Sequence, residues 1–509
     1  MIGTPTARKY LGLAILALCL AFGLYFVFIL YSTGQLMLAL IFLGVLGLGT
    51  WVYSSPGAYA YRYLFPGIAG AIVFVLFPMI YTVSIGFTNF SSKNLLPYER
   101  AKQYLLDETH RAGDVGYTMS LHPDGRAFRI KLEHPETQKT YVTEPLALRR
   151  PAPLDIPVAL VEAPVAPALD DPLPLKEIIA HQKDLKALTL VLPDKTELRM
   201  TGLREYATVE QVYEETKDGA LRKIQTGELV KPNFKTGFFE TADGQPLQPG
   251  FKVNVGFANF IQIFSDEAFR EPFLRIFAWT VVFSAITVVT TTSLGMVLAV
   301  LLNWDALRFR GVYRTLLFLP YAVPGFISIL VFKGLFNNNF GEINLVLEAL
   351  FGIRPAWFSD PALAKTMILI VNTWLGYPYM MVVCMGLIKA IPADLYEASA
   401  LAGAGPLTNF FRITLPLIIK PLTPLMIASF AFNFNNFVLI SLLTGGRPDF
   451  LDTRLPAGTT DLLVSYTYRI AFEDSGQNFG LAASISTLIF MLVAVLSIVN
   501  MRLARVNRS

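Results

Sequence analysis

Several runs of this sequence contain no charged residue and are long enough to cross a membrane. No Asp, Glu, Lys or Arg lies between Lys9 and Arg62, and the charge-free run 276–304 holds 29 residues. Because an α-helix rises about 1.5 Å per residue, roughly 20 apolar residues cross a hydrocarbon core of about 30 Å. With 53% hydrophobic and 16% charged residues, the chain is too apolar for a water-soluble globule. The sequence therefore predicts a polytopic α-helical membrane protein.

Eight spans are expected. The polar residues 32–35 divide the first long run into a hairpin of two spans, and prolines or glycines interrupt two later ones, at Pro320 and Pro324 and at Gly376 and Pro378. The predicted spans are residues 11–31, 36–53, 64–92, 276–304, 315–332, 366–388, 421–443 and 479–500. The chain divides accordingly into residues 1–92 with three transmembrane helices, an insert at 93–275, and residues 276–509 with five transmembrane helices.

The insert at 93–275 has the composition of a soluble domain. It holds all four histidines and many charged residues, and none of its apolar runs is long enough to cross a bilayer. Segments of alternating polarity flank residues 122–125 and 193–196, and each of these patterns predicts a β-hairpin. The proline-rich stretch 151–174 predicts an extended connection. We expect a mainly-β domain with one or two helices and a sandwich-like arrangement.

Basic residues indicate how the spans are oriented, because short cytoplasmic loops are enriched in Lys and Arg. Most of the basic residues that flank the predicted spans lie on the same side of the membrane. They are Arg8, Lys9, Arg62, Arg308, Arg310, Arg314, Lys389, Arg412, Lys420, Arg502, Arg505 and Arg508. Both termini and the loop 392–416 are therefore expected in the cytoplasm, and the insert in the periplasm. These basic residues form no single dense cluster, so no nucleic-acid partner is predicted.

The loop 392–416, with the sequence PADLYEASALAGAGPLTNFFRITLP, lies between two charge-free runs. Asp394 can act as the N-cap of a short helix with Glu397 at its third position, and Gly403 with the residues after it ends that helix. The loop is therefore expected to carry a small, rigid helix that faces water.

The same loop resembles the EAA loop of membrane subunits of bacterial ABC importers, which reads E-A-A, three residues, G, nine residues, I-x-L-P. The spacing is intact, and only the third Ala is changed, to Ser. The matching residues are Glu397, Ala398, Ser399, Gly403, Ile413, Leu415 and Pro416. Over nearly its whole length the chain is similar to the larger membrane subunit of maltose/maltodextrin importers, the MalF type, within the binding-protein-dependent transport inner-membrane component family. The resemblance implies a type I importer permease fold with an immunoglobulin-like periplasmic domain.

The resemblance also implies partners. These are a cytoplasmic ATPase dimer that the loop helix contacts, a second and shorter membrane subunit, and a periplasmic maltose/maltodextrin-binding protein. ATP and Mg²⁺ would belong to the ATPase, since this chain has no G-x-x-x-x-G-K-[ST] loop. We therefore expect a transport subunit of the bacterial inner membrane that has no cofactor or enzymatic activity of its own.

Polar side chains at membrane depth are costly and predict a site. Ser429, Asn433 and Asn436 are spaced to share one face of a helix, with Phe432 beside them. Amides donate to and accept from sugar hydroxyls, and rings cover the apolar face of a sugar. The resemblance implies a sugar site formed by Tyr321, Asn372, Leu375, Gly376, Tyr379, Ser429, Phe432, Asn433 and Asn436. Asn435 lies off the common face and is expected to be structural.

Other interpretations remain open from the sequence. The polar residues of the spans can hydrogen-bond between helices without binding any substrate. The cavity can also serve another oligosaccharide or a polyol. A membrane receptor with the β insert as sensor is a different class, but it requires an output domain on the cytoplasmic side.

Overall fold

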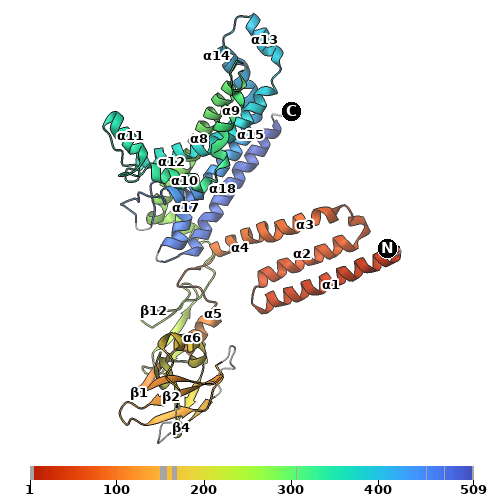
Figure 1. Ribbon diagram of the computed structural model, residues 1–509. Coiled ribbons are helices and arrows are strands. Elements are labelled where there is room, and N and C mark those ends of the chain that lie inside the picture. Colours follow the sequence, from red (N-terminus) through yellow and green to blue (C-terminus); the bar gives the residue numbers. More distant parts are fainter. Residues whose placement is uncertain are drawn as a thin grey trace. The chain divides into compact units, whose positions relative to one another are not determined.

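The computed structural model describes residues 5–148, 157–162, 169–304, 306–453, 456–474 and 476–506 (Figure 1). They form two compact units, one from residues 1–92 and 253–509 and one spanning Lys93–Lys252. The predicted boundary of the insert at residue 275 lies beyond the end of this second unit, because α7 (Ala258–Ser265) and the start of α8 belong to the membrane unit. Arg508 and much of the predicted connection 151–174 lie outside the described residues.

Every predicted span corresponds to a helical segment of the membrane unit. By length and composition, six helices of the described residues can cross a membrane, and a pair of helices bent by 92° makes a seventh candidate. The six are α1 (Pro5–Ser32), α2 (Leu36–Ser54), the α3–α4 helix (Tyr61–Gly86), α8 (Glu267–Asn303), α12 (Pro361–Lys389) and the α14–α15 helix (Pro406–Phe434). The bent pair is α9 (Arg310–Ala322) with α10 (Gly325–Leu335). The last predicted span falls on α18 (Phe479–Val506), whose apolar part, Phe479–Val495, is shorter than the other candidates.

Backbone interruptions agree with the prediction in one span and differ in two. The break near Pro324 is confirmed, because α9 ends at Ala322 and α10 begins at Gly325. The break expected at Pro320 is wrong, since Pro320 lies inside α9. The interruption expected at Gly376 and Pro378 is wrong, since α12 continues through both. Pro378 is buried, and packing against neighbouring helices keeps a helix continuous where proline removes a hydrogen bond.

The seventh span is also not the continuous helix 421–443 that we predicted. It begins at Pro406 and stops at Phe434, and a separate short helix, α16 (Phe437–Leu443), follows. Asn435 and Asn436 leave the helical conformation, and the Asn436 side chain accepts a hydrogen bond from the Leu439 N–H at the start of α16. Asparagine competes for backbone hydrogen bonds in this way, which explains the break.

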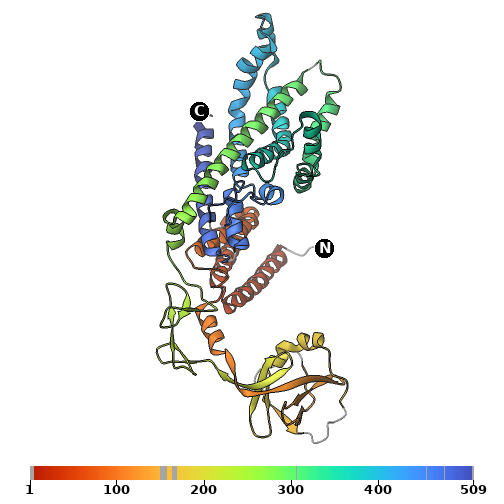
Figure 2. The ribbon, with the colours of Figure 1, turned by 90° about the vertical axis from the view of Figure 1, so that its left-hand side faces the viewer.

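Helices α8 and α12 pack extensively against each other and run parallel, and α8 is the long green helix of Figure 2. Their contacts keep a nearly constant offset in sequence, with Thr287 near Asn372 and Gly295 near Met381. A Cβ on Gly295 would lie 2.7 Å from the Met381 nitrogen, so the two backbones meet there at a distance only glycine permits. The remaining helices of this unit are η1 (Pro56–Ala58), α11 (Glu342–Phe351), α13 (Ala393–Leu401) and α17 (Leu463–Tyr468).

Among the described residues, three π-helical turns adjoin α-helices, namely η2 (Ile72–Leu76), η3 (Phe410–Thr414) and η4 (Arg469–Glu473). A π turn holds one residue more than an α turn needs and commonly marks functional segments. Two of the three lie beside the regions described below, since η3 leads into α15 and η4 carries Arg469.

The second unit is mainly β, as predicted. Both predicted hairpins are confirmed, one with Asp124 opposite Ala127 and the other with Leu190 opposite Leu198. Its helices are α5 (Tyr98–Leu106) and α6 (Leu175–Lys186).

Seven strands of this unit close into a barrel. They are β1 (Thr109–Asp124), β2 (Ala127–Glu133), β3 (Thr140–Thr143), β4 (Pro157–Glu162), β5 (Thr189–Val191), β6 (Glu197–Gly202) and β7 (Glu205–Gln211). A further sheet contains β8 (Tyr213–Glu215), β9 (Leu221–Lys223), β10 (Leu229–Asn233), β11 (Phe238–Glu240) and β12 (Pro246–Leu247).

The closed barrel differs from the two facing sheets of the expected immunoglobulin-like sandwich. The reason is the connection through α6, which returns the chain so that β5 pairs parallel to β4 and the ring closes through β7 and β1. Closure leaves no unpaired sheet edge. Inside the barrel, the Tyr206 hydroxyl donates to the Leu185 carbonyl at 2.8 Å, and burial raises the pKa of Tyr206.

A buried ion cluster holds the segment between α16 and α18. The Arg469 guanidinium lies 2.8 Å from a carboxylate oxygen of Asp461, 2.7 Å from Asp449 and 3.3 Å from Glu473. Asp461 is fully buried and also accepts from the Ser465 hydroxyl at 2.7 Å and the Gly458 N–H at 2.8 Å. Burial raises the pKa of Asp461 to about 6, against the opposing effect of Arg469, so the pair is ionised at pH 7.

Candidate substrate cavity and coupling helix

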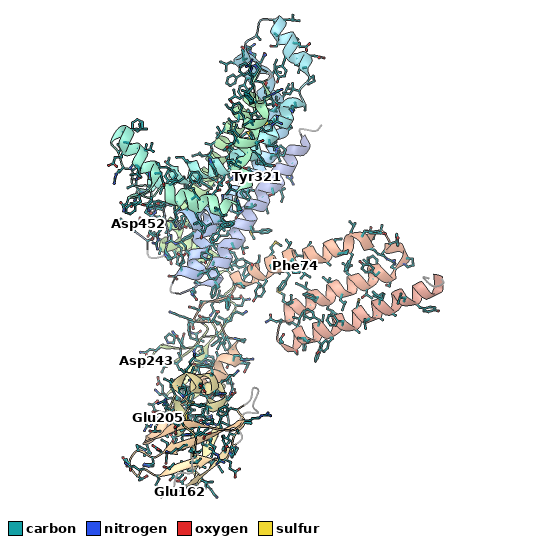
Figure 3. The ribbon with its side chains drawn as sticks, in the orientation of Figure 1. Phe74, Glu162, Glu205, Asp243, Tyr321 and Asp452 are labelled. Atoms are coloured by element: carbon teal, nitrogen blue, oxygen red, sulfur yellow. The ribbon has the colours of Figure 1, made fainter. Side chains whose placement is uncertain are left out.

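One cavity of the membrane unit brings together all nine residues of the predicted substrate site. It measures about 570 Å³ and lies among α8, α9, α10, α12, α15 and α16. Its lining includes Tyr321, Asn372, Leu375, Gly376, Tyr379, Ser429, Phe432, Asn433 and Asn436, and Figure 3 labels Tyr321. None of the described residues that line it is charged. A larger cavity of about 930 Å³ lies between α1, α2 and α3, but its lining is mostly apolar and offers fewer hydrogen-bonding groups.

Three asparagine amides form the polar wall of this cavity. The Asn372 amide nitrogen donates to Asn433 Oδ1 at 2.7 Å, and Asn436 donates to Asn372 Oδ1 at 3.3 Å. Asn433 in turn donates to the Ser429 carbonyl at 2.8 Å. Asn372 and Asn433 are both buried, so their hydrogen bonds are formed away from water. We call Asn372, Asn433 and Asn436 the amide cluster.

Asn436 reaches this wall by a different route from the one predicted. The sequence spacing placed it on the same helical face as Ser429 and Asn433, but the helix ends before it. The break at residues 435–436 instead brings Asn436 to the cluster as the N-cap residue that precedes α16. Asn435, which was expected to be structural, donates to the Ala431 carbonyl at 3.3 Å and lies outside the cavity lining.

Two threonines on α8 complete the polar wall, and the sequence reasoning missed both. Thr287 accepts a hydrogen bond from the Asn372 amide at 3.2 Å, and Thr291 lines the same cavity. A Cβ on Gly376 would lie 2.8 Å from the Thr291 methyl group, so this glycine lets α12 approach α8. No distinct signal set them apart from the other hydroxyl residues of the same span, which are Ser284, Thr290, Thr292 and Ser293.

The aromatic residues form the accessible side of the cavity. Phe432 is 72% exposed, and Tyr321 and Tyr379 are also exposed. Exposed rings next to satisfied amides suit a neutral ligand with hydroxyl groups along one edge and an apolar face.

The loop helix is present as α13, with one correction at its start. Asp394 is not the N-cap, because Pro392 occupies that position and no side chain caps the helix. Asp394 lies in the first turn, where a carboxylate is still favourable near the positive end of the helix dipole. The helix ends as predicted, since Gly403 adopts the left-handed conformation with φ of +76°.

Helix α13 presents the predicted coupling residues to solvent. Glu397 and Ala398 are exposed, and the neighbouring Leu401 is 93% exposed. Two hydrogen bonds hold the helix to the rest of the loop, from the Ser399 hydroxyl to Asn409 Oδ1 at 2.5 Å and between the hydroxyls of Tyr396 and Thr414 at 2.8 Å. Its outer surface is therefore free of contacts within the described chain while its inner surface is fixed.

The second half of the loop motif leads directly to the cavity. Ile413 lies in η3, and Leu415 and Pro416 form the first turn of α15. Helix α15 spans 20 residues and carries Asn433 near its far end. At 1.5 Å per residue this is a rod of about 30 Å between the loop and the amide cluster.

Comparison with known families matches both units of the chain. The model for the MalF P2 domain of maltose transport system permease proteins matches residues 96–256, and that for binding-protein-dependent transport system inner membrane components matches residues 291–507. Solved structures of a bacterial ABC transporter that imports alginate align with 20–21% identity over 49–50% of this chain and 83–84% of theirs, with TM-scores of 0.42 and 0.43.

Curated relatives match over nearly the whole chain. The maltose/maltodextrin transport system permease protein MalF of Klebsiella aerogenes is 53% identical over 96% of this chain and 95% of its own length. The proteins of the same name from Escherichia coli K12 and Yersinia pestis are 52% and 50% identical over 98% of this chain and 97% and 95% of theirs. This is a multi-pass inner-membrane protein, and it belongs to the MalF family of transport system permease proteins.

Proposed function

We propose that this chain is the permease subunit through which an ATP-driven importer moves maltose and maltodextrins across the bacterial inner membrane. The observation that carries the proposal is that the nine residues implied by the family resemblance line one cavity whose described lining is uncharged. The names of the full-length relatives support the choice of substrate over another oligosaccharide or a polyol. The membrane match over residues 291–507 favours a transport subunit over a receptor.

The amides of the amide cluster can exchange their hydrogen bonds to one another for hydrogen bonds to a saccharide. Each amide is already satisfied by a neighbour, so the empty site leaves few buried polar groups without a partner. A sugar hydroxyl both donates and accepts, and therefore replaces one amide partner without leaving the other unpaired. Such an exchange costs little net free energy, because a neutral hydrogen bond is replaced by another of similar strength.

The loop helix connects this cavity to the source of energy. We assign α13 to a cleft on a cytoplasmic ATPase subunit, which holds ATP and Mg²⁺, and we expect two such subunits in the assembly. Closure of the ATPase would then move α15 as a rigid rod, because η3 and two hydrogen bonds join α13 to it. The rod ends at Asn433, so its movement changes the amide cluster directly.

The rest of the proposed assembly follows from orientation and family. The termini and the loop 392–416 face the cytoplasm, and the β unit faces the periplasm, where it meets a sugar-binding protein. A second, shorter membrane subunit covers the open side of the cavity, where Phe432 is exposed. The P2-domain match over residues 96–256 supports the role of the β unit.

The test compares two glycines of the loop in the co-purified assembly, reconstituted into vesicles with ATP. Gly403→Val forces a β-branched side chain into a left-handed backbone, whereas Gly405 has an ordinary φ of −80° and open space around its Cβ position. We expect Gly403→Val to reduce maltose uptake at least tenfold and Gly405→Val to leave it nearly unchanged.

Membrane insertion and sugar binding serve as controls and should be retained in both variants. Equal uptake by the two variants would contradict the role of α13. Uptake of another sugar in preference to maltose would contradict the substrate but leave the coupling mechanism standing.

A further inference from the structure

Another cavity of the membrane unit is lined by hydrogen-bond donors that have no partner in the part of the chain that the structure describes. It measures about 460 Å³ and is lined by residues of α8, α12 and the segment before α17. Trp279 is only 9% exposed, and its indole N–H has no hydrogen-bond partner among the described residues. The Thr459 hydroxyl, on the same lining, is also buried without a partner. Buried polar groups are normally satisfied, so both donors call for an acceptor that the described part of the chain does not supply.

A cation lies among these donors. The Lys365 ammonium group is 4.6 Å from the centre of the Trp279 ring and has no carboxylate at ion-pair distance among the described residues. The other cation of the lining, Arg275, is neutralised by Glu271 and by Asp452, the latter at 2.8 Å. Figure 3 labels Asp452. The Lys365 charge is not neutralised, and the Trp279 N–H and the threonine hydroxyl have no acceptor among the described residues. Together they indicate a ligand with an anionic group that offers several acceptor oxygens.

The positions of Arg275 and Lys365 along α8 and α12 indicate how deep this cavity lies in the membrane. Arg275 and Lys365 are each the last charged residue before a charge-free run, the first on α8 and the second on α12. Because the two helices run parallel, both cations lie at the same level, where the apolar runs begin. Charged residues at that boundary lie beside phospholipid headgroups.

An apolar strip continues from this cavity along the outer face of α8. Val282 lines the cavity, and Val282, Ile286 and Val289 are exposed at i, i+4 and i+7. This spacing puts them on one face of the helix. The strip therefore extends from the headgroup level toward the middle of the bilayer, which is the path of an acyl chain.

From these observations we propose that this cavity binds one phospholipid, with its phosphate at Lys365, Trp279 and Thr459 and an acyl chain along the Val282 strip. The phosphodiester supplies acceptor oxygens and a negative charge, and the chain covers an exposed apolar face. The site is separate from the amide cluster, so this inference does not depend on the proposed sugar specificity.

The test uses the full chain with its co-purified assembly in detergent, titrated with a phosphatidylglycerol that carries a photoreactive group in one acyl chain. We expect labelling of the peptide around Val282–Val289, and Lys365→Met should reduce labelling at limiting lipid to about one tenth. Lys365→Arg should keep most of it. Lys333→Met is the matched control, because Lys333 is an exposed lysine at the end of α10.

A second variant tests the orphan donors separately. Trp279→Phe keeps an aromatic ring under Lys365 but removes the N–H, and we expect labelling to fall about threefold. Unchanged labelling in Lys365→Met would overturn the proposal. It would also be overturned if inorganic phosphate displaced the lipid at equal concentration, or if a label placed at Val282 reacted with another polypeptide of the assembly.

Discussion

Two polar clusters of the membrane unit differ in kind. The amide cluster at residues 372, 433 and 436 is neutral, while the ion cluster around Asp461 and Arg469 is charged. A neutral amide can exchange its partner for a sugar hydroxyl at little cost. A buried ion that loses its partner leaves an uncompensated charge. The first cluster is therefore suited to binding, and the second to fixing the segment between α16 and α18.

The largest expected effect comes from breaking the ion cluster. Arg469→Met leaves the fully buried Asp461 without its cation, and we expect the free energy of unfolding to fall by about 3–5 kcal/mol. Thermal unfolding of the purified chain in detergent measures this. Arg447→Met is the control, because Arg447 is exposed and has no carboxylate at ion-pair distance in the described chain.

The double variant Arg469→Met with Asp461→Asn should recover much of that loss, since it removes both charges. If Arg469→Met were as stable as Arg447→Met, the cluster would not hold the segment as described.

Breaking the amide cluster should affect transport more than stability. Asn372→Leu removes the donor to Asn433 and the acceptor of Asn436, and we expect kcat/KM for maltose uptake to fall at least tenfold. The unfolding free energy should fall by only about 1–3 kcal/mol, the usual cost of unpaired neutral groups. Asn435→Ala is the control, because Asn435 bonds only locally. A loss of uptake that merely followed the loss of folded protein would remove the distinction between the clusters.

The two clusters should also differ in their response to pH. Burial raises the pKa of Asp461 to about 6 from its ordinary value of 3.8, so the folded chain binds a proton at a higher pH than the unfolded chain does. Relative to Asp461→Asn, the wild-type chain should therefore gain about 1 kcal/mol of stability as the pH falls from 7 to 5. Denaturation at the two pH values measures the difference. A loss of relative stability instead would mean that the ion pair lowers the Asp461 pKa overall.

The smallest expected effect is at the edge of the amide cluster. Thr287→Val removes the hydroxyl that accepts from Asn372 at 3.2 Å, and we expect KM for maltose to rise about threefold with little change in kcat. Thr287→Ser keeps the hydroxyl and should behave like the wild type. Equal KM values for the valine and serine variants would show that the amide is held without this contact.

Sequence patterns predicted most of the fold because the signals were local. Charge-free runs located the spans, and alternating segments around residues 122–125 and 193–196 located two hairpins. The break at Asn435 and Asn436 was missed because either a helix or a cap suits asparagine at those positions. Closure of the barrel was missed because it depends on the pairing of β7 with β1, which are far apart in sequence.

The same reasoning explains what was found and missed at the functional sites. The amides and rings of α12 and α15 stand out in apolar spans, whereas Leu375 and Gly376 were predicted only from the family resemblance. Thr287 was not predicted, since threonine commonly bonds its own helix and gives no distinct signal. The ion cluster joins Asp449, Asp461, Arg469 and Glu473 through the folding of one irregular segment, and no periodic pattern relates them.

The π-helical turn η3 gives α15 a degree of freedom that a straight rod lacks. The surplus residue of such a turn can pass one place along the chain while the hydrogen bonds on either side stay formed. Each step turns the residue it passes by about 100°, the angle that one residue occupies in an α-helix. A pull on α13 can therefore turn one residue within 410–414 while the hydrogen bonds of α15, and the contact of Asn433 with Asn372 near its far end, stay formed.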